Sequence, residues 1–128
     1  MLYENEDMTI LRDNFKLIQK VNGFRFSVDA VILSDFFNPH KDGKVLDIGT
    51  GNGIIPILLY AKNKSRDIVG IDIQEENSSL AIRNIELNKL EEYIEIVNYD
   101  VKEYPFGNSF DYIVSKSTLY ESRWKETK

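Results

Sequence analysis

Three glycines at alternate positions, directly after a short apolar run, constrain the fold of this chain more than any other feature. The run covers residues 44–49 and ends at Gly49, Gly51 and Gly53 follow, and an apolar segment of helical length begins at residue 54. Glycine lets the backbone turn sharply and approach a ligand closely, and the first amide groups of a helix have no partner within it. The stretch predicts a buried strand, a ligand-binding loop and a helix over residues 54–61.

The glycine spacing bears on the kind of ligand. The dinucleotide-binding fingerprint has two residues between its second and third glycines, whereas here Asn52 alone separates Gly51 from Gly53. The spacing therefore disfavours a nicotinamide cofactor, and a nicotinamide-dependent oxidoreductase stands only as a third alternative. A tight turn that binds nothing is the structural alternative.

Strand-like and helix-like segments alternate after the glycines. Residues 68–73, 93–97 and 110–114 are short and rich in β-branched and aromatic residues, which predicts three more strands. Residues 75–89 carry apolar side chains at helical spacing and acidic residues in the first turn, which predicts a helix. This alternation is typical of an α/β fold with a parallel sheet joined by right-handed crossovers.

The first forty residues predict a hairpin and a helix. Asn22–Gly23 separates two short apolar and aromatic runs, and this dipeptide suits the tight turn of a β-hairpin. Ser27 is a suitable N-cap for a helix over residues 28–37, which ends before Asn38–Pro39. We therefore expect an N-terminal hairpin and helix ahead of the parallel sheet.

Length and composition narrow the function classes. A chain of 128 residues is the size of one domain or a piece of one. The net charge of −5 disfavours a non-specific nucleic-acid binder, although a local basic site remains open. There are no cysteines, and His40 is the one histidine, so we expect no metal site. No apolar run approaches the roughly 20 residues of a membrane span, and we expect a cytoplasmic protein.

Two carboxylates and two apolar residues fall where nucleotides bind in α/β proteins. Asp72 closes the second strand of the predicted sheet, the position from which such proteins contact ribose hydroxyls. Asp100 follows the third strand and would reach the same crevice, where it could accept a hydrogen bond from an adenine amino group. Ile73 and Val101 offer apolar faces to the ring. The alternative is that both carboxylates are solvated loop residues.

These motifs together resemble the class I S-adenosylmethionine-dependent methyltransferases. Asp47-Ile-Gly-Thr-Gly-Asn-Gly53 is similar to their first motif, Gly70-Ile-Asp72 to the ribose-binding motif and Tyr99-Asp100-Val101 to the adenine-contacting motif. The resemblance implies a Rossmann-like fold whose first four strands lie in the order 3-2-1-4, and S-adenosylmethionine as cofactor. The cofactor contacts that we expect are Asp47, Gly49, Thr50, Gly51, Asn52, Gly53, Asp72, Ile73, Asp100 and Val101.

A narrower resemblance concerns the methyl acceptor. Asn22 to Ala30 is similar to a stretch of the bacterial enzymes that methylate N6 of adenosine 37 in a valine transfer RNA. In such enzymes the fourth strand runs into Asn-Pro-Pro-Tyr, which holds the target amino group, but here the chain reads Lys116-Ser-Thr-Leu-Tyr120. We assign no catalytic residue for this reason. A catalytically inactive cofactor-binding or interaction module is the alternative function.

The resemblance also predicts the organisation of the chain. We expect an N-terminal hairpin and helix at residues 1–43, the S-adenosylmethionine-binding half at 44–115 and a divergent tail at 116–128, so that the fold is truncated after its fourth strand. That strand would then form a sheet edge, and exposed apolar edges favour pairing with another chain. We expect self-association through this edge or a tail folded back over it, and transfer RNA as a partner of the full-length form.

Overall fold

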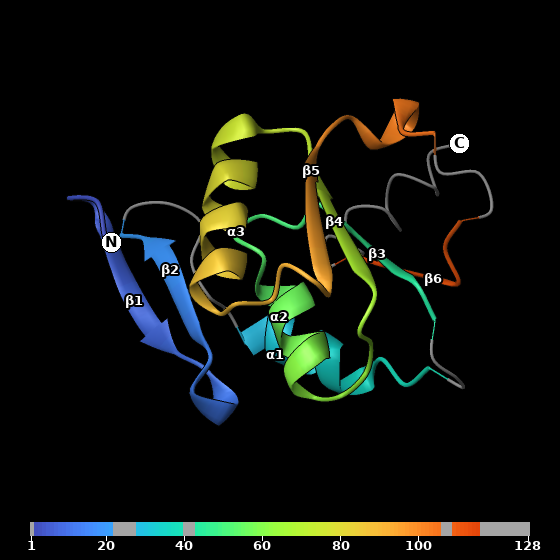
Figure 1. Cartoon of the computed structure of the whole chain (residues 1–128), viewed down its shortest axis with the longest axis horizontal. Helices are drawn as coiled ribbons and strands as arrows, with labels where there is room; N and C mark the ends of the chain where they lie inside the picture. The colour runs from blue at the N-terminus through green and yellow to red at the C-terminus, as the bar shows by residue number, and fades with distance from the viewer. Residues whose placement is uncertain (1, 22–27, 40–42, 106–108, 116–128) are drawn as a thin grey trace.

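The computed structural model describes residues 2–21, 28–39, 43–105 and 109–115 of the chain (Figure 1). Two short 3₁₀ turns, Arg12–Asn14 and Val101–Glu103, accompany the regular elements. The strands and helices are β1 (Glu6–Ile10), β2 (Lys16–Lys20), α1 (Val28–Phe36), β3 (Val45–Ile48), α2 (Ile54–Ala61), β4 (Ile68–Asp72), α3 (Glu75–Leu87), β5 (Ile94–Asn98) and β6 (Tyr112–Val114).

Four parallel strands form the central sheet in the order β5-β4-β3-β6. This order confirms the predicted 3-2-1-4 arrangement and the α/β, Rossmann-like fold class. In the register of the sheet, Asp47 of β3 lies opposite Gly70 of β4 on one side and Val114 of β6 on the other. Because all four strands run the same way, the loops that follow them gather at one edge of the sheet.

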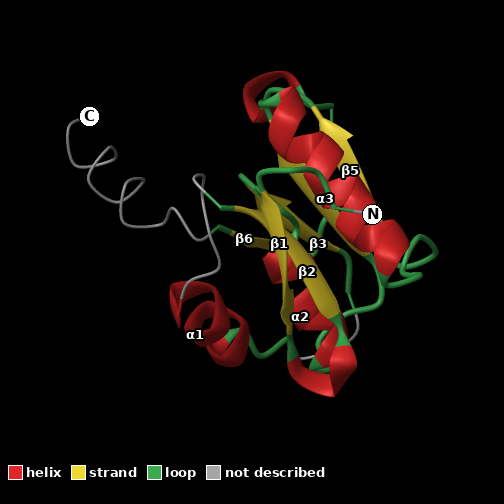
Figure 2. Cartoon of the chain, turned by 90° about the vertical axis from the view of Figure 1, so that its left-hand side faces the viewer, coloured by secondary structure: helices red, strands yellow, loops and turns green. Residues whose placement is uncertain are grey.

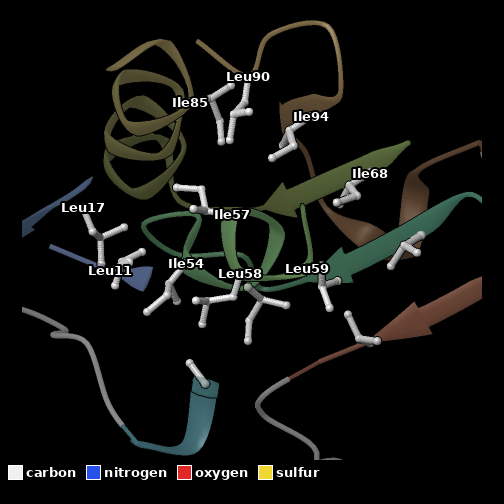
Figure 3. Packing of buried hydrophobic residues seen from close by; sticks show 14 residues of the cluster. Leu11, Leu17, Ile54, Ile57, Leu58, Leu59, Ile68, Ile85, Leu90 and Ile94 are labelled. Carbon is white, nitrogen blue, oxygen red and sulfur yellow. The ribbon is translucent and has the colours of Figure 1, made fainter. Parts of the chain in front are cut away.

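Helix α2 lies at the centre of the main hydrophobic core. All of its residues from Ile54 to Leu59 are buried, since the helix is apolar on every side. Figure 3 shows Ile57, Leu58 and Leu59 between the hairpin side chains Leu11 and Leu17 and the sheet. Proline at position 56 is compatible with the helix because the first turn needs no amide donor there.

The opposite face of the sheet carries a smaller apolar cluster. Leu46, Val69 and Ile71 are buried there, and Tyr104 and Phe110 pack against them. Side chains along a strand alternate between the two faces of a sheet, so β3 and β4 contribute to both clusters. The strands are apolar on both faces, as the uninterrupted apolar runs in the sequence predicted.

The hairpin formed by β1 and β2 is antiparallel, with Glu6 opposite Lys20 and Ile10 opposite Lys16. The chain reverses through the 3₁₀ turn at residues 12–14, where Asp13 and Asn14 have φ angles of 58° and 66°. Short polar residues of this kind tolerate the left-handed region better than others do. Sequence analysis placed a hairpin turn at Asn22–Gly23, which lies outside the described residues, and it did not predict β1.

The hairpin and helix α1 lie against the sheet from its helical side. Seen from its own side, the hairpin lies between α1 and α3 (Figure 2). Helix α1 packs beside α2, and its C-terminal carbonyl groups accept hydrogen bonds from Lys64 Nζ, with distances of 2.6 Å to Phe37 O and 2.9 Å to Asp35 O. None of the helices in the described parts of the chain is long and apolar enough to cross a membrane.

Candidate functional site

The loop between β3 and α2 turns through three left-handed glycines. The φ angles of Gly49, Gly51 and Gly53 are 72°, 60° and 89°, in a region that side-chain-bearing residues rarely adopt. The Gly49 and Thr50 amides both donate to the carbonyl of Ile71, at 2.9 and 3.0 Å. The loop is therefore folded back onto the end of β4, and its glycines are needed for that turn.

The Asp72 carboxylate joins this loop to the start of α3. Its Oδ2 accepts a hydrogen bond of 2.8 Å from the Gly51 amide, and its Oδ1 accepts one of 2.9 Å from the Gln74 amide. The side-chain amide of Asn77 lies 3.4 and 3.5 Å from the two oxygens. Asp72 is only 8% exposed. One strand-end carboxylate thus holds the glycine-rich loop and the next helix in a common frame.

A pocket of about 170 Å³ lies at the carboxyl ends of β3 and β4, beside the loop that follows β5. Open α/β sheets bind ligands at this edge. Its walls combine apolar side chains, a glycine and two carboxylates. The lining residues are Ile48, Gly49, Ile71, Asp72, Ile73, Tyr99, Asp100 and Val101.

Five of the ten predicted site residues line this pocket: Gly49, Asp72, Ile73, Asp100 and Val101. They come from three loops that are separate in the sequence, and the parallel sheet brings them together. The remaining five do not line the pocket; they are Asp47, Thr50, Gly51, Asn52 and Gly53. Gly51 reaches the site through its hydrogen bond to Asp72, and Gly53 is the N-cap of helix α2.

Three of the predicted residues are buried in the frame of the loop. Thr50 is fully buried, and its side chain lies so close to β4 that a Cβ on Gly70 would stand 2.6 Å from Thr50 Oγ1. Asn52 Oδ1 accepts a hydrogen bond of 3.2 Å from the Ile54 amide at the start of α2. Asp47 is fully buried within β3, between β4 and β6. These three side chains pack against or within the elements that support the loop, which are β3, β4 and α2.

The loop after β5 supplies the third wall. Asp100 Oδ1 accepts a hydrogen bond of 3.0 Å from the Lys102 amide and so caps the short 3₁₀ turn. The ring of Tyr99 stands edge-on to Tyr104 with 5.6 Å between their centroids. Two of the apolar lining residues remain exposed, Ile73 at 65% and Tyr99 at 42%. Apolar surface is thus open in the pocket, as binding of a flat ring requires.

Sequence analysis missed the asparagines of α3. Asn77 contacts the Asp72 carboxylate, and Asn84 donates a hydrogen bond of 2.9 Å to the carbonyl of Asn52 in the glycine-rich loop. Asparagine is unfavourable in a helix interior. The repetition of Asn77 and Asn84 on one helical face, continued by Asn88 just after the helix, was therefore a signal that these side chains form hydrogen bonds. Among the described residues, no three histidine, cysteine, aspartate or glutamate side chains lie together in a group that could hold a metal ion.

The chain is similar to methyltransferases of more than one kind. It is 26% identical over 97 residues to the tRNA1(Val) (adenine(37)-N6)-methyltransferase of Glaesserella parasuis, a match that spans 76% of this chain but 41% of that protein. It is 45% identical over 51 residues to the release factor glutamine methyltransferase of Fusobacterium nucleatum, which covers 40% of this chain and 14% of that one.

A solved structure and a family model extend these matches. The crystal structure of P. horikoshii TYW2 in complex with MeSAdo superimposes with a TM-score of 0.72 at 22% identity, over 87% of this chain and 42% of that one, which supports the fold. The chain thus spans less than half the length of these proteins. A family model described as a methyltransferase domain matches residues 39–127. Because this match covers well over half of the sequence, the chain belongs to the methyltransferase domain family.

Proposed function

We propose that this chain binds S-adenosylmethionine in the pocket at the carboxyl ends of β3 and β4. The observation that carries the proposal is the meeting of a glycine-rich loop, the strand-end carboxylate of Asp72 and the Asp100 carboxylate around one pocket with apolar walls. Proteins that bind dinucleotide cofactors in α/β sheets use a glycine-rich loop and a strand-end carboxylate in this arrangement. S-adenosylmethionine would supply an activated methyl group on its sulfonium.

The residues present fit such a cofactor. A Cβ added to Gly49 would meet no atom within 4 Å, so this glycine faces open space. The pocket is below the roughly 300 Å³ of a typical small-molecule site, which suits one ring rather than a whole cofactor. We expect the adenine ring to lie between Ile73 and Val101, with its amino group donating to Asp100.

The ribose would occupy the space beside Asp72. Each carboxylate oxygen accepts more than one hydrogen bond, so the Gly51 and Gln74 amides leave acceptor capacity for ribose hydroxyls. The methionine part would then extend along the glycine-rich loop toward the start of α2, where backbone amides favour a carboxylate. The protein contributes orientation of the methyl donor, which is the main requirement of a direct transfer.

Calorimetry with S-adenosylhomocysteine tests the site. Asp72→Ala should weaken binding by about 1 to 3 kcal/mol, because it leaves ribose hydroxyls and loop amides without their acceptor. Gly49→Val should also weaken binding, since its side chain would enter the pocket. The matched control is Asp111→Ala, which removes a carboxylate that accepts a hydrogen bond of 2.9 Å from the Lys44 amide outside the pocket. Equal binding by wild type, Asp72→Ala and Gly49→Val would contradict the assignment.

For the methyl acceptor, we propose N6 of an adenosine in transfer RNA, which would place the activity in the cytoplasm. The support is the similarity to the tRNA1(Val) (adenine(37)-N6)-methyltransferase of Glaesserella parasuis. The sequence Lys116-Ser-Thr-Leu-Tyr120 lacks the acceptor motif expected after the fourth strand. We therefore expect this chain by itself to bind cofactor without transferring methyl groups, as a cofactor-binding module would.

Transfer of labelled methyl groups to unmodified valine transfer RNA separates the two functions. We expect binding of S-adenosylhomocysteine and no turnover by the purified chain. Turnover would show that other groups of this chain hold the acceptor. A release-factor substrate belongs in the same assay, because the release factor glutamine methyltransferase of Fusobacterium nucleatum is 45% identical over 51 residues.

We also propose that copies of the chain associate through β6 and helix α1. Among the described strands β6 pairs with β3 alone, and Ile113 is 56% exposed. Val28, Ile32 and Phe36 follow one another at a spacing of four residues on α1, and all three are exposed. An apolar helical face beside a strand whose outer edge pairs with no described strand favours contact with a second copy.

A further inference from the structure

One face of α3 contacts the Asp72 carboxylate, the glycine-rich loop and strand β2. Asn77, Ala81, Asn84 and Asn88 are spaced by four, three and four residues, which places them on a single helical stripe. Asn77 contacts the Asp72 carboxylate. Ala81 lies beneath the loop, where a Cβ on Gly53 would approach its own Cβ to 3.4 Å.

The other two asparagines bind the hairpin in the way that a neighbouring strand would. Asn84 accepts from the Ile18 amide at 2.7 Å and donates to the Ile18 carbonyl at 3.1 Å. Asn88 does the same with Lys16, at 2.8 and 2.7 Å. Four helical residues rise about 6 Å and two strand residues about 6.6 Å. The distance from Asn84 to Asn88 along α3 therefore matches the distance from Ile18 to Lys16 along β2. Backbone groups of β2 that face away from β1 are thereby paired.

Asn84 differs from Asn88 in one contact. Its Nδ2 also donates to the carbonyl of Asn52, at 2.9 Å, and this carbonyl belongs to the glycine-rich loop. The third contact of Asn88 is with the carbonyl of Asn84 inside the helix. Asn84 is fully buried and uses both amide hydrogens. One side chain therefore holds the hairpin and the loop at once.

The hairpin has further attachments to the same helix. Arg83 forms two hydrogen bonds with the Glu6 carboxylate, at 2.7 and 2.9 Å, and Glu6 is 8% exposed. Lys20 forms an ion pair with Glu76 at the beginning of α3. The hairpin is thus attached to α3 at several points. Among these attachments, Asn84 is the side chain that also contacts the glycine-rich loop.

We propose that Asn84 is a positioning residue that couples the N-terminal hairpin to the cofactor loop. This inference rests on the proposed function, because the loop is taken to bind S-adenosylmethionine. Cofactor binding orders the loop, and Asn84 transmits that order to β2. By thermodynamic linkage, a molecule whose affinity for the hairpin is changed by the cofactor changes cofactor affinity by the same factor.

Hydrogen exchange of the wild-type chain with and without S-adenosylhomocysteine is the first test. The ligand should slow exchange at the Gly51 and Gly53 amides of the loop and, by about fivefold or more, at the Ile18 amide that Asn84 holds. The Asp111 amide, at the other end of the sheet, is the reference. Slowing of the loop amides with no change at Ile18 would overturn the proposal.

Two matched variants separate coupling from simple support of the fold. Asn84→Ala and Asn88→Ala each remove one pair of hydrogen bonds to β2, but only Asn84→Ala removes the contact with the loop. Asn84→Ala should weaken S-adenosylhomocysteine binding about fivefold or more, and Asn88→Ala should leave it within about twofold. Equal weakening by both variants, or none by either, would refute a special role for Asn84.

A second readout keeps this inference separable from the cofactor assignment. Without any ligand, Asn84→Ala should speed exchange at the Gly53 amide more than Asn88→Ala does. If the wild type binds no S-adenosylhomocysteine but this difference appears, the cofactor assignment fails and the coupling stands. If the wild type binds the ligand and both variants give equal Gly53 exchange and equal affinity, the coupling fails and the cofactor assignment stands. An Asn84→Ala variant that does not fold leaves the wild-type experiment to decide.

Discussion

The half of the molecule around β4 and β5 and the half around β6 differ in whether their surface groups have partners within the chain. On the side of β4 and β5, the hairpin and α3 meet through buried amide and carboxylate groups that bind one another, such as Asn84 with β2 and Arg83 with Glu6. The hairpin also has exposed apolar side chains, such as Ile10 at 59%, but on the side of β6 three follow one another at helical spacing on α1, and Phe36 among them is 78% exposed. A buried polar network specifies one arrangement of its parts, whereas an exposed apolar face leaves its partner open.

Helix α1 is firmly attached to the rest of the molecule even though its outer face is exposed. Lys62 Nζ donates to Val31 O, Ser34 Oγ and Asp35 Oδ1, at 3.2, 2.5 and 2.6 Å, and so ties α1 to α2. The hydrogen bond from Lys62 also lowers the pKa of Asp35 below its usual value. The helix is held on its inner side while its outer apolar face stays uncovered. An exposed apolar face on a firmly attached helix is typical of a surface that binds another molecule.

The largest effect should come from the packing behind the glycine-rich loop. Gly70→Val would place a Cβ 2.6 Å from Thr50 Oγ1, so we expect the free energy of unfolding to fall by about 3 kcal/mol. Urea denaturation measures this. In a Thr50→Gly background the loss should be smaller, because the clashing side chain is gone. An equal loss in both backgrounds would show that this contact does not limit the loop.

A smaller effect should appear where the hairpin joins α3. The hydrogen bonds from Arg83 lower the pKa of Glu6, and the one hydrogen bond that the Tyr3 amide donates to this carboxylate lowers it further. A lowered carboxyl pKa stabilises the fold at neutral pH, and that stabilisation is lost as the pH falls through the folded-state pKa. Glu6→Gln should therefore cost about 1 kcal/mol at pH 7, and progressively less as the pH falls through the folded-state pKa of Glu6.

Thermal unfolding of the wild type and Glu6→Gln across this pH range provides the measurement. A difference between the two proteins that stays constant with pH would mean that the ion pair does not attach the hairpin. The corresponding variant on the other side, Asp35→Asn, should matter less, because that carboxylate is solvent-exposed. The pH dependence of unfolding should therefore be larger for Glu6→Gln than for Asp35→Asn, each relative to the wild type.

The smallest effect on stability should come from the exposed face of α1. Phe36→Lys should change the free energy of unfolding by no more than about 0.5 kcal/mol, since the side chain is mostly in solvent. The same variant should reduce self-association, which light scattering measures against concentration. Ile113→Lys on β6 should act in the same direction. A wild type that stays monomeric at high concentration would contradict association through this surface.

Much of the fold could be predicted from local pattern. The apolar runs at 44–49 and 68–73 became β3 and β4, and the helix expected over 54–61 became α2 with the same bounds. These segments are predictable because strand runs and helix periodicity are properties of neighbouring residues. Strand β1 was missed, since Glu6–Ile10 mixes charged and apolar residues without a regular alternation. Its pairing depends on β2 and on α3.

The candidate site divides in the same way. Glycine spacing and strand-end position predicted that Gly49, Asp72 and Asp100 would meet at one pocket. The same reasoning gave Thr50 and Asn52 as cofactor contacts, and these stay predictions. What the sequence did not give is where their side chains lie, which is against β4 for Thr50 and at the start of α2 for Asn52. Sequence order cannot tell which way a side chain in a tight turn points. That direction depends on the backbone angles of the neighbouring glycines.

The sequence by itself determined the α/β class, the order of strands and helices from residue 44 onward and the end of the sheet where we propose that a ligand binds. These follow from residue size, polarity and glycine content over short windows. Only the tertiary structure decided that Asn84 pairs with Ile18, 66 residues away, and Arg83 with Glu6, 77 residues away. Contacts at such separation form only after the helices and strands have packed, because the entropy of closing so long a loop must first be offset by burial of the core.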